Sequence, residues 1–254
     1  MLNDLLDTEP DLLGSILGVL LRFRQFAYAV KADIKDMFLC IEIIEKDRGA
    51  QRFLWRGADR DREPDELEMI TLIFGSTASP TSAIYVKNEN AARFSQTKPM
   101  AAASIKKNSY MDDFLASLPS TKETKKLISD VIEINSEVGF VMHGWASNDE
   151  QIISSICTED KLKIKKQANL SKEERVLGLY WDQDGDNLGF NVGFEKIRAE
   201  LKNGSVKPSK REVFSTTMSV YDPLGILSPF TIQAKLLIQD IWRSGISWDA
   251  EIRE

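Results

Sequence analysis

The chain is nearly devoid of histidine and cysteine. It holds one histidine, His143, and two cysteines, Cys40 and Cys157, among 254 residues. A zinc site needs three or four Cys or His ligands, with carboxylates filling in, and two cysteines cannot build a disulfide framework. Every Ser-His-Asp or Cys-His enzyme would have to use His143. Chemistry in this chain is therefore expected to depend on carboxylates and a hard metal ion.

Long apolar runs are also lacking. The most apolar stretch, Leu12–Leu21, is interrupted by two glycines and a serine and ends against Arg22. It predicts a helix packed on a core, because a membrane-spanning helix needs about 20 consecutive apolar residues. The Met1–Pro10 stretch carries three acids and no basic residue, which argues against a secretory signal. We expect no membrane partner.

The composition is that of a globular protein, with 43% hydrophobic and 28% charged residues. The net charge of −6 argues against a stand-alone nucleic-acid binder, because phosphate affinity comes largely from Lys and Arg. The acidic excess lies in residues 1–150. Residues 151–254 are balanced and contain two basic runs, Lys161–Lys166 and Lys196–Arg211. If nucleic acid binds, this second part is expected to hold its backbone.

Hydrophobic periodicity predicts both strands and helices. A helix is expected from Ser79, as N-cap, through about Phe94, with Pro80 in its first turn. A turn at Asp184–Asn187 predicts a hairpin between two short strands. The expected strands are Tyr28–Asp33, Gln51–Arg56, Leu67–Phe74, Val176–Tyr180 and Leu188–Val192; a β-hairpin with two acids at its tip is expected over Lys106–Ser117, and further helices over Lys122–Val138, Lys210–Tyr221 and Thr231–Ser244. Together they indicate an α+β protein with a boundary between residues 150 and 170.

Three acids could carry the chemistry. Asp33 ends a predicted strand, and Asp112 and Asp113 lie on the predicted hairpin 79 residues later. Nucleotidyl transfer uses two divalent ions about 3.5–4 Å apart, and hard cations take oxygen ligands. Two carboxylates from different strands that meet at one edge of a sheet would satisfy this need. The alternative is that Asp112 and Asp113 form a solvated turn and that Asp33 is an ordinary surface acid.

The residues around these acids resemble a known family. Tyr110-Met111-Asp112-Asp113 is similar to the central catalytic hairpin of reverse transcriptases, and Asp33–Phe38 resembles their first acidic motif. Other blocks follow in the order seen in Pao/BEL-type LTR retrotransposon polyproteins: Gln51–Arg56, Phe74-Gly75 with Ala78–Pro80, Gly139-Phe140 with Trp145–Asn148, Val176–Trp181, Lys210–Val213 with Tyr221–Pro229, and Trp242–Gly245. The resemblance to the reverse transcriptase domain covers nearly the whole chain.

The resemblance implies a polymerase right-hand palm, which is an antiparallel sheet with packed helices. Residues 1–150 would form the palm with a remnant of the fingers, which are otherwise largely missing. Residues 151–254 would form a primer-grip hairpin and a thumb- or connection-like region. The RNase H, integrase, protease and capsid regions of such polyproteins are expected to have no counterpart in the chain. Trp181, Trp242 and Trp248 are expected to be core residues rather than stacking platforms for bases.

The implied function is RNA-directed DNA polymerase, which transfers dNTPs onto a primer with two Mg²⁺ ions, or Mn²⁺ in their place. Asp33 and Asp112 would ligate both ions, and Asp113 would support the site. The remaining implied roles are a steric gate against ribonucleotides for Phe38, a nucleotide-binding floor for Gly75, Ser79 and Pro80, the primer side of the hairpin for Tyr110 and Met111, and a candidate general acid for His143.

The implied partners are an RNA/DNA template–primer, dNTPs and the rest of the polyprotein, namely RNase H, integrase and protease. The implied location is a cytoplasmic retrotransposon particle. Two alternatives stay open. One is an inactive, truncated remnant that keeps the palm fold. The other is a viral RNA polymerase with the same palm, against which Phe38 argues because such an enzyme must admit the 2′-hydroxyl.

Overall fold

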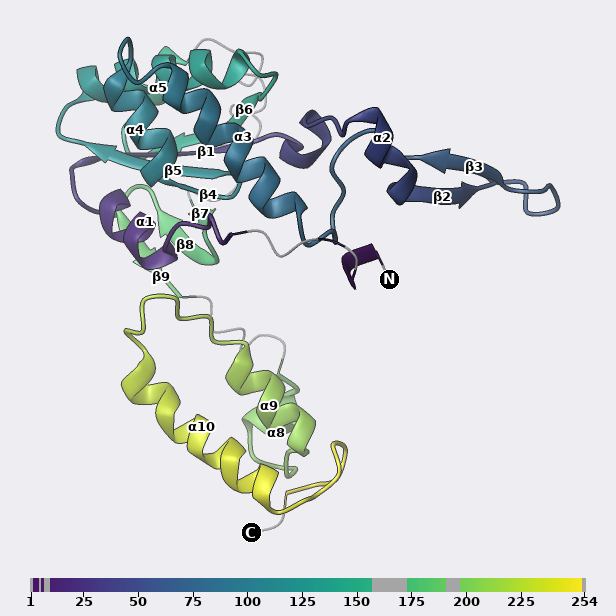
Figure 1. The fold of residues 1–254 in the computed structure, drawn as a ribbon. Helices are drawn as coiled ribbons and strands as arrows, with labels where there is room; N and C mark the ends of the chain where they lie inside the picture. Colours follow the sequence, from purple (N-terminus) through teal and green to yellow (C-terminus); the bar gives the residue numbers. More distant parts are fainter. Residues whose placement is uncertain (1, 5, 7–9, 157–172, 191–196, 253–254) are drawn as a thin grey trace. The chain divides into compact units, whose positions relative to one another are not determined.

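The computed structural model describes residues 1–254 except 1, 5, 7–9, 157–172, 191–196 and 253–254 (Figure 1). Cys157, the basic run Lys161–Lys166 and the end of the expected strand Leu188–Val192 lie outside the described residues. The chain divides into two compact units, Met1–Ser171 and Lys172–Glu254. The sequence predicted a boundary between residues 150 and 170, with residues 1–150 as the first part. Helix α6 (Glu150–Ser155) packs on strand β6 and helix α5 of the first unit.

A four-stranded antiparallel sheet forms the centre of the first unit. Its strands are β1 (Tyr28–Ile34), β4 (Ser109–Tyr110), β5 (Asp113–Leu118) and β6 (Met142–Ser147), in the order β4-β5-β1-β6. The predictions of a strand at Tyr28–Asp33 and a hairpin within Lys106–Ser117 are confirmed. Strand β1 is central and pairs with β5 on one side and with β6 on the other.

Helices cover both faces of this sheet (Figure 1). Helices α3 (Ser79–Arg93), α4 (Pro99–Lys107) and α5 (Thr121–Ser136) lie together on one face. The alternate residues Val30, Ala32 and Ile34 of β1 point into the core with them, as expected for a period of two. Helix α1 (Ile16–Phe23) packs on β5 from the other face. It leaves uncovered the end of that face to which Asp33 and Asp113 belong.

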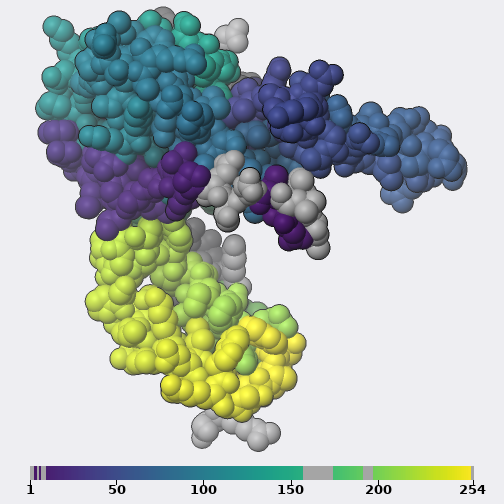
Figure 2. All heavy atoms as spheres, viewed as in Figure 1, coloured from purple at the N-terminus to yellow at the C-terminus, as the bar shows by residue number. Residues whose placement is uncertain are grey.

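The segment after β1 forms short helices and an extended hairpin. The short helices are η2 (Met37–Cys40), α2 (Glu45–Arg48) and η3 (Gly49–Gln51). Strands β2 (Arg52–Trp55) and β3 (Asp65–Glu68) then pair in antiparallel fashion. All residues of β2 and β3 are exposed, and Figure 2 shows that this hairpin extends away from the rest of the first unit.

The predicted strand Leu67–Phe74 was wrong. The β2–β3 register runs from Arg52 opposite Glu68 to Trp55 opposite Asp65, so the second strand begins at Asp65. Arg52 also forms an ion pair with Glu66 at 2.8 Å. Beyond Glu68 the backbone instead bonds to the segment after η2, where the Leu72 amide donates to the Ile41 carbonyl.

Helix α3 begins as predicted, but its cap differs. Ala78 is the N-cap, without a side-chain cap, and Ser79 is the first helical residue, with Pro80 next to it. The prediction that Ser79 caps the helix was therefore wrong. Its hydroxyl is turned inward: Ser79 is buried, and its Oγ has no hydrogen-bond partner within the described part of the chain.

The second unit contains a three-stranded antiparallel sheet and three helices among its described residues. The strands are β7 (Glu173–Val176), β8 (Leu179–Asp182) and β9 (Asn187–Gly189), and the helices are α8 (Ala199–Lys202), α9 (Lys210–Met218) and α10 (Ser228–Arg243). The predicted strand Val176–Tyr180 was wrong, because Leu177 and Gly178 adopt positive φ angles of 46° and 85° and turn the chain between β7 and β8.

Aromatic residues hold the ends of α9 and α10 together. The ring centroids of Trp242 and Trp248 lie 5.2 Å apart, and Phe214 contacts both. The Lys210 ammonium lies 4.0 Å from the Trp242 ring centre, which is within range of a cation–π interaction. Trp181 is fully buried, as expected for a core residue, whereas Trp242 and Trp248 are 49% and 40% exposed. Among the described residues, no helix combines the length and apolarity needed to cross a membrane.

Candidate active site: three carboxylates at one end of the first sheet

Strand register brings Asp33 and Asp113 together. The β1–β5 pairing places them directly opposite each other, although 80 positions separate them in the sequence. Directly paired residues project from the same face of a sheet, with Cβ atoms about 4.5–5.5 Å apart. Because Ala32 and Phe114, their neighbours, point into the core, the two aspartates lie on the opposite face of the sheet.

Asp112 lies in the turn that joins β4 to β5. Tyr110 pairs with Asp113, so Met111 and Asp112 are the two turn residues, and Met111 adopts a positive φ of 55°. Two-residue hairpins favour such angles because they match the twist of the strands. The Asp112 carbonyl accepts a hydrogen bond from the Ile34 amide at 3.0 Å. The turn is therefore fastened to β1 next to Asp33.

The three carboxylates interact electrostatically. Burial raises the pKa of Asp33, and the charge of Asp112 raises it further, while His143 and Lys31 lower it. Burial, then Asp112 and Asp33, raises the pKa of Asp113 from 3.8 to about 6. Like charges that share a site disfavour ionisation in this way. A bound cation would therefore reduce the repulsion among the three carboxylates.

His143 faces Asp33 because of a bulge in β6. Asp33 pairs with His143 and Lys31 pairs with Ala146, so β6 contains one extra residue between these pairs. Gly144 adopts a φ of 63° there, as expected for a glycine in a β-bulge. The His143 Nε2 lies 3.5 Å from Asp33 Oδ2. The imidazole predicted as a candidate general acid thus lies beside the first carboxylate.

A buried lysine supports the hairpin from the core side. Lys87 of α3 is 3% exposed, and its Nζ donates a 2.6 Å hydrogen bond to the Met111 carbonyl. Burial lowers the pKa of Lys87 to about 8, and the charge of Asp112 opposes that shift. Sequence reasoning missed this residue. A lysine in the middle of an otherwise partly apolar helix was the available signal.

Four of the other predicted nucleotide-binding residues, Phe38, Gly75, Ser79 and Pro80, lie on η2, on the loop before α3 and at the start of α3. Phe38 is largely buried in the core, and its ring meets that of the exposed Phe74 edge-on, with centroids 4.9 Å apart. Gly75 follows with a φ of 92°, and its carbonyl accepts a hydrogen bond from the Asn3 side chain at 2.9 Å. Asn3 also accepts one from the Thr77 amide at 3.1 Å. Asn3, which sequence reasoning also missed, clips the loop that leads to Ser79 and Pro80.

The oxygen donors of the cluster fit a hard cation. In the described ranges, no three His, Cys, Asp or Glu side chains are grouped closely enough to form a metal site by themselves. However, Asp33 Oδ1 is buried without a hydrogen-bond partner in the described structure, and burying such an atom is costly unless a donor or a cation satisfies it. Mg²⁺ is usually held by one or two carboxylates together with substrate phosphates. The cluster therefore fits a metal site in which the substrate would supply the remaining ligands.

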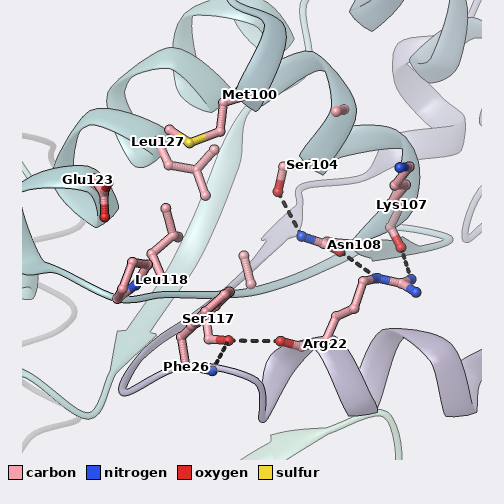
Figure 3. Close-up of a pocket in the computed structure, with 13 residues that line it drawn as sticks. Arg22, Phe26, Met100, Ser104, Lys107, Asn108, Ser117, Leu118, Glu123 and Leu127 are labelled. Atoms are coloured by element: carbon pink, nitrogen blue, oxygen red, sulfur yellow. Dashed lines mark hydrogen bonds between the residues drawn. The ribbon is translucent and has the colours of Figure 1, made fainter.

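A separate pocket of about 330 Å³ lies between α1, α4, α5 and β5 (Figure 3). Phe26, Met100 and Leu127 contribute apolar walls, and Arg22 lies at its polar end, where its Nε donates to Asn108 Oδ1 at 2.8 Å. None of the three carboxylates lines this pocket. It is therefore distinct from the candidate active site.

Comparisons with known proteins relate the chain to retroelement polyproteins. Residues 209–254 match the model of the Pao retrotransposon-like RNaseH-like domain. The fold is similar to that of the foamy viral protease-reverse transcriptase in complex with RNA/DNA hybrid, with 17% identity, a TM-score of 0.52, and coverage of 92% of this chain and 26% of that one. It is also similar to the foamy viral protease-reverse transcriptase dRH in complex with ds DNA, with 16% identity, a TM-score of 0.56, and coverage of 98% and 36%.

The two solved structures show likeness of fold, and this chain spans 26% to 36% of their length. No curated protein matches the chain. The α+β class and its antiparallel sheets agree with these structures. The match at residues 209–254 corrects the expectation that an RNase H region has no counterpart in the chain. The blocks after Lys210 were assigned to the reverse transcriptase domain because they follow the Y-M-D-D block in order. However, neighbouring domains of a polyprotein also follow one another in order, so the order does not show which domain a block belongs to.

Proposed function

We propose that the first unit is the catalytic palm of an RNA-directed DNA polymerase from a Pao/BEL-type retrotransposon. The observation that carries the proposal is the pairing of Asp33 with Asp113, with Asp112 in the adjoining turn. Three acids from two distant segments share one end of a sheet, and the buried Asp33 Oδ1 lacks a partner in the described structure. This convergence favours a shared role over the alternative of a solvated turn and an ordinary surface acid.

The chain's own residues would bind and orient the reactants. Asp33 and Asp112 would hold two Mg²⁺ ions, or Mn²⁺, with Asp113 supporting the site. When bound, such ions activate a primer hydroxyl and stabilise the charge on the triphosphate. His143, beside Asp33, would donate a proton to the leaving pyrophosphate. Tyr110 and Met111 would face the primer strand.

The surrounding elements would select the nucleotide. Phe38 would act as the steric gate that excludes a ribose 2′-hydroxyl. Gly75, Ser79 and Pro80 would shape the floor under the base pair. The template–primer would contact the second unit, whose strands and helices would include the primer grip and a thumb- or connection-like part. In the cell, the chain would act in a cytoplasmic particle with the RNase H region to which residues 209–254 are similar and with the integrase and protease parts of its polyprotein.

Primer extension on poly(rA)/oligo(dT) with Mg²⁺ tests the proposal. We expect the wild-type chain to incorporate dTTP and Asp112→Asn to lose incorporation. Glu89→Gln, a charge-removing change at an exposed position of α3, is the matched control and should keep it. If wild type, control and Asp112→Asn all fail to incorporate, and Mn²⁺ binds them equally, the chain is an inactive remnant that keeps the fold.

A further inference from the structure

Lys87 combines burial, charge and a contact with the catalytic hairpin. Its side chain runs from α3 through the core and is almost fully enclosed, with 3% of its surface exposed. Lysine is almost never fully buried unless it is paired. Its Nζ donates a hydrogen bond to the backbone carbonyl of Met111 at 2.6 Å. A core position that could hold an apolar residue is thus used to bind one peptide group of the turn.

That peptide group connects the lysine to Asp112. Met111 has a positive φ of 55°, an angle that is unfavourable for a residue with a Cβ. The next carbonyl, that of Asp112, accepts the Ile34 amide at 3.0 Å. The turn is therefore fixed at two consecutive carbonyls, one by Lys87 from the core and one by β1. These two hydrogen bonds stabilise the unfavourable φ angle and fix the position of the Asp112 backbone, from which its carboxylate extends.

The charge of Lys87 has a second effect. Asp112 is near enough to Lys87 to influence its ionisation, and Asp112 in turn interacts with Asp33 and Asp113. An ammonium beneath the turn attracts the Asp112 carboxylate, which the other two carboxylates repel. It does so without occupying the face where a metal and substrate would bind, because it approaches from the helix side of the sheet.

We infer that Lys87 is a positioning residue that holds Asp112 in its metal-binding place before any metal or substrate arrives. Its ammonium binds the Met111 carbonyl and so fixes the strained turn. This inference deepens the proposed polymerase function and rests on it only for the kinetic consequence. The structural consequence can be measured on the chain by itself.

The test compares Lys87→Met with Asn90→Leu. Methionine keeps the length and buried volume of lysine and removes the donor and the charge. Asn90 is also buried on α3, but its amide donates to the Ile134 carbonyl of α5, at 2.6 Å, and not to the hairpin. Each variant removes one buried hydrogen bond made by a side chain of α3. Only the bond lost in Lys87→Met has its acceptor in the turn.

Amide hydrogen exchange is the first measurement. The Ile34 amide, protected by the Asp112 carbonyl, should exchange roughly tenfold to a hundredfold faster in Lys87→Met, the factor expected for loss of one hydrogen bond from a charged donor. In Asn90→Leu it should change no more than the other amides of β1. Equal acceleration of Ile34 and of the rest of β1 in Lys87→Met would mean general destabilisation and would overturn the inference.

Steady-state kinetics separate this inference from the proposed function. Lys87→Met should lower kcat at least tenfold and leave the KM for dTTP within about twofold, because the binding floor is untouched while Asp112 is displaced. A KM that rises while kcat is kept would contradict a positioning role. If no variant polymerises but Ile34 exchange is selectively accelerated, the polymerase function fails and the role of Lys87 in the turn stands.

Discussion

Replacing Asp113 with asparagine should stabilise the first unit at alkaline pH. Burial, Asp112 and Asp33 raise the pKa of Asp113 from 3.8 to about 6. A folded-state pKa above the unfolded value means that the contribution of this group to stability is fully present below pH 3.8 and is lost as pH rises through about 6. At pH 8 the ionised carboxylate therefore opposes folding, and Asp113→Asn removes that opposition.

The expected size follows from the shift. One pKa unit corresponds to about 1.36 kcal/mol, so the full shift would correspond to about 3 kcal/mol. Asp113 is only partly buried, and solvent screening reduces the effect, so we expect Asp113→Asn to raise the free energy of unfolding by about 1–2 kcal/mol at pH 8. At pH 4.5 the gain should fall below half of that, because the folded protein then holds Asp113 largely protonated.

The urea dependence of amide exchange in peptides from β1 and β5, measured in EDTA at pH 8 and pH 4.5, isolates the first unit. Asp130→Asn is the control of opposite sign. Burial raises the pKa of Asp130, but Lys126 and Lys98 lower it on balance, so this variant should lose stability at pH 8 and lose less as pH falls. If Asp113→Asn is destabilising at pH 8, or its effect is the same at both pH values, the three carboxylates do not repel one another as described.

Three further changes test other parts of the molecule. Gly144→Ala should cost the first unit about 1–2 kcal/mol in urea unfolding, because its φ of 63° is unfavourable with a Cβ; no loss would show that the β6 bulge differs in solution. Phe38→Ala should admit ribonucleotides in primer extension, and unchanged discrimination between dTTP and UTP would remove the gate assignment. Gly178→Ala places a Cβ 2.4 Å from the Tyr221 ring and should destabilise the second unit in thermal unfolding; Tyr221→Ala should restore part of the loss, and additive effects would contradict the contact.

Local sequence patterns predicted the elements that carry the acids. The apolar residues in Tyr28–Asp33 and on both sides of Asp112 and Asp113 were sufficient, since both strands are largely buried. The register that pairs Asp33 with Asp113 was not predictable from periodicity. It depends on contacts between segments far apart in the sequence, namely the hydrogen bond from the Ile34 amide to the Asp112 carbonyl and the packing of β5 against α5.

The errors have physical causes. Leu67–Phe74 is apolar enough for a strand, but β3 spans Asp65–Glu68, and the backbone of Ile70 and Leu72 bonds to the segment after η2. Val176–Tyr180 is rich in β-forming residues, yet Leu177 and Gly178 turn the chain there, and Tyr221 packs directly against Gly178. In each case tertiary contacts override the local propensity. Lys87 escaped prediction because its place among apolar residues of α3 is only a weak signal that a helical lysine points inward.

Electron paramagnetic resonance of bound Mn²⁺ tests the central claim most directly. With template–primer and a non-hydrolysable dNTP, two Mn²⁺ ions held about 3.5–4 Å apart should give the spectrum of a coupled pair. Asp33→Asn and Asp112→Asn should each abolish the coupling, and Glu89→Gln should keep it. A wild-type spectrum of isolated Mn²⁺ that neither aspartate substitution changes would show that these carboxylates do not form a two-metal site.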